Sequence, residues 1–452
     1  MTDLTEALAD HAANFPAAKV TATISEHLAL DLADTLAAAI GGSRTEGVRE
    51  TLQFLAGETA PGVSQVFGDA RRLSALAAAQ ANATAAHALD YDDTLDEGGG
   101  MHAGAAVHSA ALAVADQLGG VSGSKYVSAV AVGLDVAVRL ALAPTQDFGW
   151  HRTSAFGVFG VTVAVGRLLG LTRDQFANAL GIAYSQASGN RQCIPDGALT
   201  KRLQSGFSAR DGITAVRLAQ AGLTGPANAF EGRDGFFNLY QRGAYDRDIV
   251  LRGLGDTLLG GRISLKPYPC GRNLHAILDA ALEARAEGGS TDIASVRVGI
   301  APAAAARANL GFPRHVVEAQ FNIPFAVALV LATGAASLDA FDQPSAVDPS
   351  VRDLFGKIAI EAQDGRPDAA PGAAIVEIDY ADGRRHRAEV TTPRGHPTRP
   401  LDAEAIAAKF QDCNAFAGAP LLPDQVREVV ETALVLPSLG STRHLTRLLN
   451  TA

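Results

Sequence analysis

The amino-acid sequence predicts a mostly α-helical protein, in which a large all-helical domain is accompanied by a smaller α+β domain. The chain is rich in alanine, the best helix former, and only 6% of its residues are aromatic. Helix signals follow one another through residues 1–260, and strand-like alternation appears only after them. The length of 452 residues suits two domains, because a domain commonly spans about 100–200 residues.

The first 260 residues contain successive helix start and stop signals. Asp69 and Ser122 stand where a side chain can cap a first turn, and Thr172 with Gln175 forms a capping-box pattern. The pair Gly119-Gly120 suits the end of a helix. These signals predict helices over residues 69–89, 107–118 and 122–139, a helix that starts after Thr172, and a helix over 211–221.

Strand signals mark the smaller domain. Residues 295–300 alternate in polarity, and 357–362 are a second candidate strand. The alternating stretches 375–380 and 386–392 flank Asp382-Gly383, a pair typical of a tight β-hairpin turn. The apolar stretch 319–333 predicts a helix. We therefore place the helical domain at residues 1–260, completed by 400–452, and the α+β domain at 261–399.

Composition argues against several functional classes. A net charge of −10 disfavours general binding to nucleic acid or to anionic membranes. The three cysteines are far apart and form no C-x-x-C pair, which argues against a disulfide framework, a structural zinc site or an iron–sulfur cluster. The polar N-terminus lacks signal-peptide features, and no clean run of about 20 apolar residues appears. We expect a cytoplasmic protein.

The first candidate site is a run of carboxylates, DYDDT at residues 90–94, followed by three glycines and His102. Such a run often lies at a solvated helix end; alternatively, it delivers an acid and a histidine to a cleft. The pattern Asp92-Asp93-x-x-Asp96 also resembles the magnesium–diphosphate motif of isoprenoid synthases, since magnesium prefers carboxylate ligands. A second copy of that motif is absent from the sequence, and the run leads directly into glycines.

Two further stretches offer imidazole and cations. His151 follows the only tryptophan and precedes a Gly-rich apolar run, and histidine suits acid–base chemistry because its pKa lies near working pH. Arg191 precedes a segment without acids, from Gly197 to Arg210, in which Lys201 and Arg202 lie. Such cations bind carboxylates through charge-assisted hydrogen bonds. A helix-capping histidine and a solvated basic face are the structural alternatives.

The fourth stretch, RISLKPYPCGRNLH at residues 262–275, also lacks acids. It contains Lys266, Arg272 and His275, and two prolines beside Tyr268 stiffen it. It falls at the predicted domain junction, where ligand pockets are favoured. The alternative is a proline-shaped connector that carries surface charges.

Together these stretches supply carboxylates, three histidines and several cations. This set suits removal of a proton from a carbon next to a carboxylate, because cations stabilise the negative charge that then builds on the carboxylate oxygens. A histidine or aspartate takes the proton, and a second histidine protonates a leaving group. No P-loop, G-x-S-x-G elbow or H-E-x-x-H helix indicates another chemistry.

The same stretches resemble the MmgE/PrpD family, in the family's order and over most of the chain. The resemblance is carried by HALDYDDT with His102 shortly after it, WHRTSAFG, DGALTKRLQSGFSARDG, GLTGPANAFEGRDGF, SLKPYPCGRNLH, AQFNIPFAVALVLATG and LDAEAIAAKF. It implies a large helical domain with a smaller α+β lid domain, usually in a homodimer, and no metal or other cofactor. The family includes 2-methylcitrate dehydratase, cis-aconitate decarboxylase and iminodisuccinate epimerase, which all act on di- or tricarboxylates.

The resemblance also assigns roles to residues. His102 and His151 are expected to flank the substrate, and Asp93 to orient a histidine or act as base. The expected catalytic residues are Asp93, His102, His151, Lys201 and His275. The expected substrate-binding residues are Arg191, Arg202, Lys266, Tyr268 and Arg272.

The chain departs from the family's pattern around its first site histidine. Ala103 follows His102 where many members have proline, and Gly98–Gly100 form an unusual insert before it. These departures leave the substrate open. We expect dehydration of a hydroxy-polycarboxylate such as 2-methylcitrate first, and decarboxylation or epimerisation of a related polycarboxylate second. A non-catalytic helical binding protein is the alternative from another class.

Overall fold

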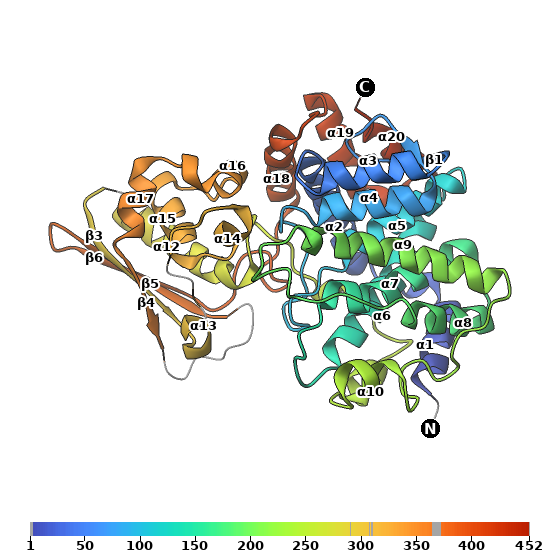
Figure 1. Cartoon of the computed structure of the whole chain (residues 1–452). Coiled ribbons are helices and arrows are strands. Elements are labelled where there is room, and N and C mark those ends of the chain that lie inside the picture. The colour runs from blue at the N-terminus through green and yellow to red at the C-terminus, as the bar shows by residue number, and fades with distance from the viewer. Residues whose placement is uncertain (1–2, 290, 307, 309–310, 364–371, 452) are drawn as a thin grey trace. The chain divides into compact units, whose positions relative to one another are not determined.

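A computed structural model of the protein describes residues 3–289, 291–306, 308, 311–363 and 372–451. The chain divides into two compact units (Figure 1). The helical unit comprises Met1–Ala88, Asp92–Ile263 and Asp402–Ala452, and the mixed unit comprises Leu89–Tyr91 and Ser264–Leu401. Within the described residues, no helix combines the length and the apolar character that crossing a membrane requires.

The helical unit is built almost entirely from α-helices. Its helices are α1 Leu4–Asn14, α2 Ala22–Gly42, α3 Val48–Glu58, α4 Ala75–Ala86, α5 Gly104–Gln117, α6 Gly123–Leu142, α7 Arg152–Leu169, α8 Arg173–Tyr184, α9 Thr200–Gln220, α10 Phe236–Gln241, α11 Arg247–Leu251, α18 Ala403–Phe416, α19 Pro423–Leu434 and α20 Arg443–Leu448. The C-terminal helices α18 and α19 pack on α2, so the end of the chain completes this unit (Figure 1).

Two helix starts predicted from capping residues are confirmed, and a third is wrong because paired strands occupy that position. Ser122 caps α6, and Thr172 forms the capping box of α8. Asp69 does not begin a helix, because β2 (Arg72–Leu73) pairs there with β1 (Pro61–Gln65) and α4 starts only after Ser74. This small antiparallel pair also corrects the expectation of an all-helical domain. Helix α9 starts at Thr200 rather than at residue 211, so the basic segment is helical.

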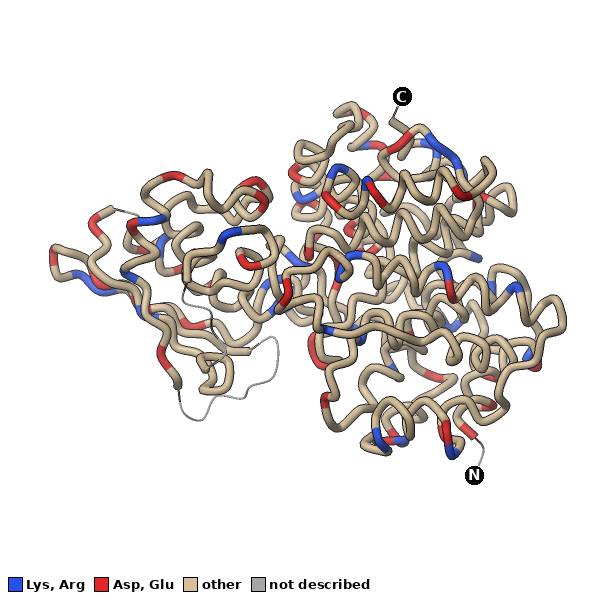
Figure 2. Tube along the Cα trace, viewed as in Figure 1, with Lys and Arg blue, Asp and Glu red and all other residues tan. Residues whose placement is uncertain are grey.

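Helices α4, α5 and α9 pack against one another in the interior of the helical unit, and α7 packs on α5 and α9. Helix α4 contains no Lys, Arg, Asp or Glu, and it is an uncharged stretch of the tube in Figure 2. Gly206 on α9 lets the two helices approach closely, since a Cβ atom there would lie 2.2 Å from the Thr84 hydroxyl of α4. This close approach places the start of α9 beside the end of α4.

The mixed unit combines a sheet with short helices. Its elements are α12 His275–Gly288, β3 Ile293–Ile300, α13 Pro302–Ala306, α14 Val316–Gln320, α15 Ile323–Thr333, α16 Leu338–Asp342, α17 Pro349–Phe355, β4 Ile358–Ala362, β5 Ala374–Tyr380 and β6 Arg385–Val390. The strand order is β4-β3-β5-β6, with β3 and β4 parallel and the other pairs antiparallel. Helix α12 packs on β5, β6 and α15, and this contact forms much of the unit's apolar core (Figure 1).

The predicted strands are confirmed, whereas the predicted helix over 319–333 is wrong in its extent. The β5–β6 hairpin turns at Asp382-Gly383, where Gly383 has a φ of 87°. The helix is interrupted at Phe321, because Asn322 caps α15 and Pro324 occupies its first turn.

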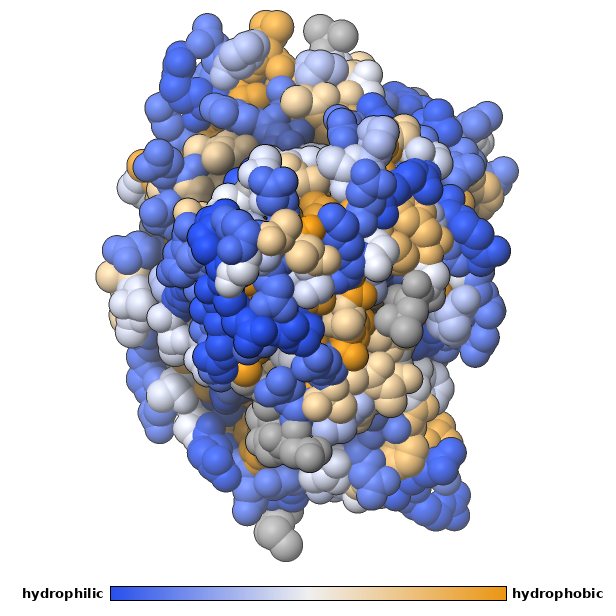
Figure 3. Space-filling model, turned by 90° about the vertical axis from the view of Figure 1, so that its left-hand side faces the viewer, coloured by the Kyte–Doolittle hydropathy of each residue, from blue (hydrophilic) through white to orange (hydrophobic). Residues whose placement is uncertain are grey.

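One face of the sheet carries ion pairs. Arg297 of β3 lies 2.9 Å from Glu377 and 2.6 Å from Asp379 of β5, and Arg385 of β6 lies 2.6 Å from Asp379. Figure 3 looks onto this end of the mixed unit and shows a dense hydrophilic area. Such a charged surface matches the alternation by which these strands were predicted.

Candidate active site

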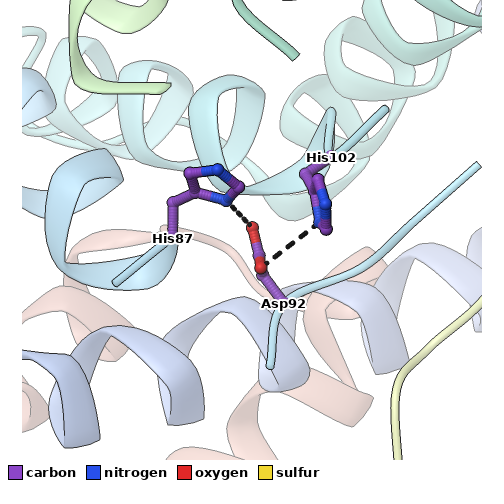
Figure 4. A group of neighbouring side chains, drawn as sticks. All are labelled: His87, Asp92 and His102. Carbon is purple, nitrogen blue, oxygen red and sulfur yellow. Dashed lines mark hydrogen bonds and ion pairs between the residues drawn. The ribbon is translucent and has the colours of Figure 1, made fainter. Parts of the chain in front are cut away.

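Three buried side chains of the helical unit contact one another where two helices end and begin (Figure 4). His87 is the C-cap residue of α4, Asp92 follows it, and His102 lies just before α5. The distance from His87 Nδ1 to Asp92 Oδ2 is 2.7 Å, and from His102 Nδ1 to Asp92 Oδ1 it is 3.3 Å. Asp92 therefore bridges two imidazole rings, whose centroids lie 4.7 Å apart.

His151 and Lys201 adjoin this group. His151 is the N-cap residue of α7, and its ring centroid lies 5.6 Å from that of His87. Lys201 is in the first turn of α9, with its Nζ 3.4 Å from His87 Nε2. We call His87, Asp92, His102 and His151 the imidazole cluster. The structure thus brings together three predicted site residues, His102, His151 and Lys201.

Burial sets the charge state of the cluster. It lowers the pKa of His87 to about 4, helped by the positive charge of Lys201 and opposed by Asp92. It also lowers the pKa of His151 well below its usual value, helped by His87 and Lys201. Burial alone would raise the pKa of Asp92, but the adjacent His87 and His102 hold it well below its usual range. At neutral pH the cluster therefore combines an ionised carboxylate with neutral His87 and His151.

The two neighbouring aspartates have different interaction partners. The carboxylate of Asp93 accepts hydrogen bonds from the backbone N–H groups of Ala103 and Gly104, both at 3.0 Å, at the start of α5. Burial raises the pKa of Asp93 well above its usual value, helped by the negative charges of Asp31 and Asp92 and opposed by these hydrogen bonds. Asp92, rather than the predicted Asp93, is thus the aspartate that contacts the histidines. Because proline has no N–H, the alanine at 103 supplies a donor that the common family residue lacks.

Sequence reasoning missed His87 and Asp92 as site residues. His87 opens the motif HALDYDDT, and this was the available signal, but an imidazole at the end of an Ala-rich helix also suits a simple cap. The magnesium–diphosphate interpretation is not supported by the geometry. Asp92 faces two imidazoles, whereas Asp93 faces the backbone of α5, so the two carboxylates do not turn toward one cation.

His87, Asp92 and His102 also have the chemistry of metal ligands, with ligand atoms within 4.8 Å of one another. The fit is poor, because the carboxylate already contacts both imidazoles directly and the Lys201 ammonium approaches His87 Nε2. A second cation beside this ammonium would be repelled. We therefore derive no chemical step through a metal.

The other predicted cations of the helical unit have partners elsewhere. Arg191 is exposed and forms an ion pair with Asp147 at 2.6 Å. Arg202 is buried, and its guanidinium donates to the backbone carbonyl of Glu46. These contacts tie both arginines to partners outside the imidazole cluster.

The mixed unit buries two of the predicted substrate-binding residues in polar contacts of its own. Lys266 Nζ lies 2.9 Å from the Asp90 carboxylate, and both side chains are almost completely buried. The Tyr268 hydroxyl donates to Asp279 at 2.6 Å, and burial together with this carboxylate raises the pKa of Tyr268. These contacts stabilise the loop that the two prolines stiffen.

His275 is fully buried in the mixed unit, and both ring nitrogens are engaged. Nε2 lies 3.3 Å from the carbonyl of Cys270, and Nδ1 lies 3.2 Å from the Arg272 guanidinium. A carbonyl only accepts and a guanidinium only donates, so the ring is neutral with its proton on Nε2. This geometry favours a role of His275 in holding Arg272.

The helical architecture and the imidazole cluster define an enzyme equipped for proton transfer beside an anion. Neutral imidazoles can accept protons, the Asp92 carboxylate can stabilise a positive charge on an adjacent imidazole, and Lys201 carries a positive charge.

The chain belongs to the MmgE/PrpD family. The model of the MmgE/PrpD N-terminal domain matches residues 6–247, and that of the C-terminal domain matches residues 268–434. The chain is similar to a cis-aconitate decarboxylase of Aspergillus terreus, with 26% identity over 99% of this chain and 96% of that protein. It is also similar to the cis-aconitate decarboxylases of Homo sapiens (28%; 92% and 88%) and Mus musculus (27%; 92% and 87%). The protein is a lyase of this family.

Proposed function

We propose that the protein removes carbon dioxide from cis-aconitate or from an unsaturated tricarboxylate of similar shape. The observation that carries the proposal is the imidazole cluster with Lys201 beside it. The relatives named cis-aconitate decarboxylase favour decarboxylation over the dehydration that was expected first. Dehydration is the second candidate, because the neutral state of His151 suits proton abstraction.

The proposed reaction breaks one carbon–carbon bond and forms one carbon–hydrogen bond. As a carboxylate leaves as carbon dioxide, its bonding electron pair enters the adjacent conjugated system. Negative charge builds on a remaining carboxylate, where a cation such as Lys201 stabilises it. An imidazolium then delivers a proton to the carbon beside that carboxylate, which leaves an unsaturated dicarboxylate and a neutral histidine.

A low pKa in the empty site is compatible with this donor role. His87 and His151 are neutral at rest because they are buried beside Lys201. A bound tricarboxylate brings negative charge, and opposite charge raises the pKa of a nearby imidazole. We expect the histidine that donates the proton to acquire it when the substrate binds. A histidine that was already charged before the substrate bound would not have to take up a proton at that point.

The proposal extends to predicted features outside the cluster. In the mixed unit, Arg272 is the cation that we propose to bind a substrate carboxylate, since His275 holds its guanidinium and Lys266 is paired with Asp90. The cytoplasmic location and the homodimer expected from the resemblance are likewise part of the proposal.

A proton NMR assay in deuterated buffer tests the function directly. Purified protein is incubated separately with cis-aconitate, citrate, 2-methylcitrate and an aspartate-derived dicarboxylate. Decarboxylation predicts carbon dioxide release from cis-aconitate and one solvent deuteron in the product. His151→Ala should lower kcat/KM by about 100-fold or more, whereas His444→Ala, at an exposed position, should not. Pretreatment with a chelator should leave the rate unchanged.

Three outcomes would contradict the proposal. Conversion of 2-methylcitrate alone would favour the dehydratase. Loss of activity after chelation would point to a metal enzyme. Full turnover in both His151→Ala and His102→Ala would remove the imidazole cluster from the mechanism.

A further inference from the structure

Gln204 of α9 is a buried amide whose orientation is fixed by the backbone of Asn190. Its Oε1 accepts from the Asn190 N–H at 3.0 Å, and its Nε2 donates to the Asn190 carbonyl at 2.9 Å. Rotating the amide by half a turn would set donor against donor and acceptor against acceptor. The hydrogen bonds therefore identify which amide atom is the oxygen.

The same oxygen lies 3.1 Å from His151 Nδ1. Because an amide oxygen only accepts, Nδ1 must carry the hydrogen of this bond. The neutral ring then has its lone pair on Nε2. Among the described residues, none forms a hydrogen bond with Nε2. His87 differs, because Asp92 and Lys201 engage both of its nitrogens.

A close-packed turn at Gly189 fixes the positions of His151, Gln204 and Asn190. The backbone N–H of His151 donates to the carbonyl of Gly189 at 3.4 Å. Gly189 has a φ of 111°, and a Cβ atom there would lie 2.7 Å from Gln204 Oε1 and 2.7 Å from Ser154 Cβ. Only glycine fits this position without displacing the amide. Gln204 Nε2 also contacts Cys193 Sγ at 3.2 Å.

We infer that Gln204 is a positioning residue, which fixes the tautomer of His151 so that Nε2 carries the proton moved in the reaction. The statement that Nε2 carries the moving proton rests on the proposed function, whereas the statement about the tautomer does not. The tautomer is a property of the resting protein, and it is set by Gln204 whichever polycarboxylate is the substrate. A histidine in the other tautomer would present an N–H where the reaction needs a lone pair.

Nitrogen-15 NMR of the imidazole side chains tests the tautomer without any substrate. In the wild-type protein we expect a protonated Nδ1 and an unprotonated Nε2 at His151, assigned by loss of its signals in His151→Ala. Gln204→Leu should give a mixture of tautomers, and kcat should fall about 10-fold or more with little change in KM. Gln192→Leu, at an exposed glutamine of the same segment, is the matched control and should leave both unchanged.

Gln204→Glu provides the conservative rescue and a second readout. Its carboxylate still accepts from Nδ1, so the tautomer should be retained. The added negative charge should raise the pKa of His151, so the limb of the kcat/KM profile that reports this histidine, the alkaline limb for a proton donor, should move upward by about one pH unit. An unmoved limb would overturn the inference even if Gln204→Leu failed to fold.

The two claims fail separately. A wild-type His151 protonated at Nε2, or an unchanged tautomer in a folded Gln204→Leu, overturns the positioning role. The expected tautomers without turnover of any tested polycarboxylate would support Gln204 as the tautomer-fixing group and count against the proposed function.

Discussion

Two of the buried groups of histidines and aspartates in the described part of the helical unit differ in their ratio of acidic to basic side chains. In the imidazole cluster, His87 and His102 contact the ionised carboxylate of Asp92, and His151 lies beside His87. In the second group, the acid network of Asp31, Asp34, His108 and Lys409, two carboxylates share one histidine and one ammonium. His108 Nε2 lies 3.1 Å from Asp31, and Lys409 Nζ lies 2.5 Å from Asp34.

The aspartate pKa values shift upward in the acid network and downward in the imidazole cluster. Burial raises the pKa of both Asp31 and Asp34 to about 7, against the positive charge of Lys409. The pKa of Asp92 is instead held low, because two imidazoles outweigh burial. An equally buried carboxylate is thus protonated readily in one group and kept ionised in the other.

The two groups occupy different positions along their helices. The imidazole cluster comes from helix ends, where side chains extend beyond the regular packing. The acid network comes from helix interiors, with Asp31 and Asp34 on one face of α2, His108 on α5 and Lys409 on α18. We infer that the cluster serves chemistry, while the network fastens the C-terminal helix to the rest of the unit.

Among the substitutions that test this comparison, Lys409→Met should have the largest effect on stability. It leaves two buried carboxylates without their cation, and removing one partner of a buried pair costs about 3–5 kcal/mol of unfolding free energy. The loss should be full at pH 8 and smaller at pH 6, where Asp31 and Asp34 can take up protons. Urea unfolding at both pH values measures it.

Lys19→Met is the matched control, because Lys19 pairs with Asp256 at an exposed position. That substitution should cost less than about 1 kcal/mol. A Lys409→Met variant as stable as this control would show that the acid network does not fasten α18.

Identical substitutions at neighbouring positions provide the second test. Asp92→Asn removes the negative charge beside His102 and should lower kcat/KM about 100-fold, with the fold intact. Asp93→Asn keeps an acceptor for the N–H groups of α5, so it should change kcat/KM less than about 5-fold and cost about 1 kcal/mol of stability. Steady-state kinetics and urea unfolding separate the two effects. The reverse ranking would return Asp93 to the catalytic role predicted from sequence.

The sequence predicted what local rules determine. Ser122 and Thr172 cap their helices as expected, and Asp382-Gly383 turns the hairpin, because each signal involves residues a few positions apart. Asp69 failed as a cap, since the pairing of β1 with β2 takes precedence over a local preference there. Motif order located His102, His151 and Lys201, which the fold brings together from three separate helix starts.

Contacts across long separations could not be predicted in the same way. The choice between Asp92 and Asp93 depends on the direction of the chain after α4 ends, where helical periodicity no longer applies. Gln204 lies 53 residues from His151 and appears as an ordinary polar position of α9. His108 and Asp31, 77 residues apart, are each unremarkable in their helices, and only the packing of α2 against α5 pairs them.

A pH-dependent effect, about 1 kcal/mol per pH unit, should come from Asp31→Asn. Burial raises the pKa of Asp31 from its usual value to about 7, so between about pH 4 and pH 7 the folded state holds a proton that the unfolded state has lost. Its contribution to stability is complete below pH 4 and disappears as the pH rises through 7. The asparagine variant lacks this proton, so its unfolding free energy should rise relative to wild type across that range. Urea unfolding at several pH values measures the two curves, with exposed Asp424→Asn as control. Parallel curves for wild type and Asp31→Asn would mean that Asp31 is ionised like Asp92, and the contrast between the two groups would fail.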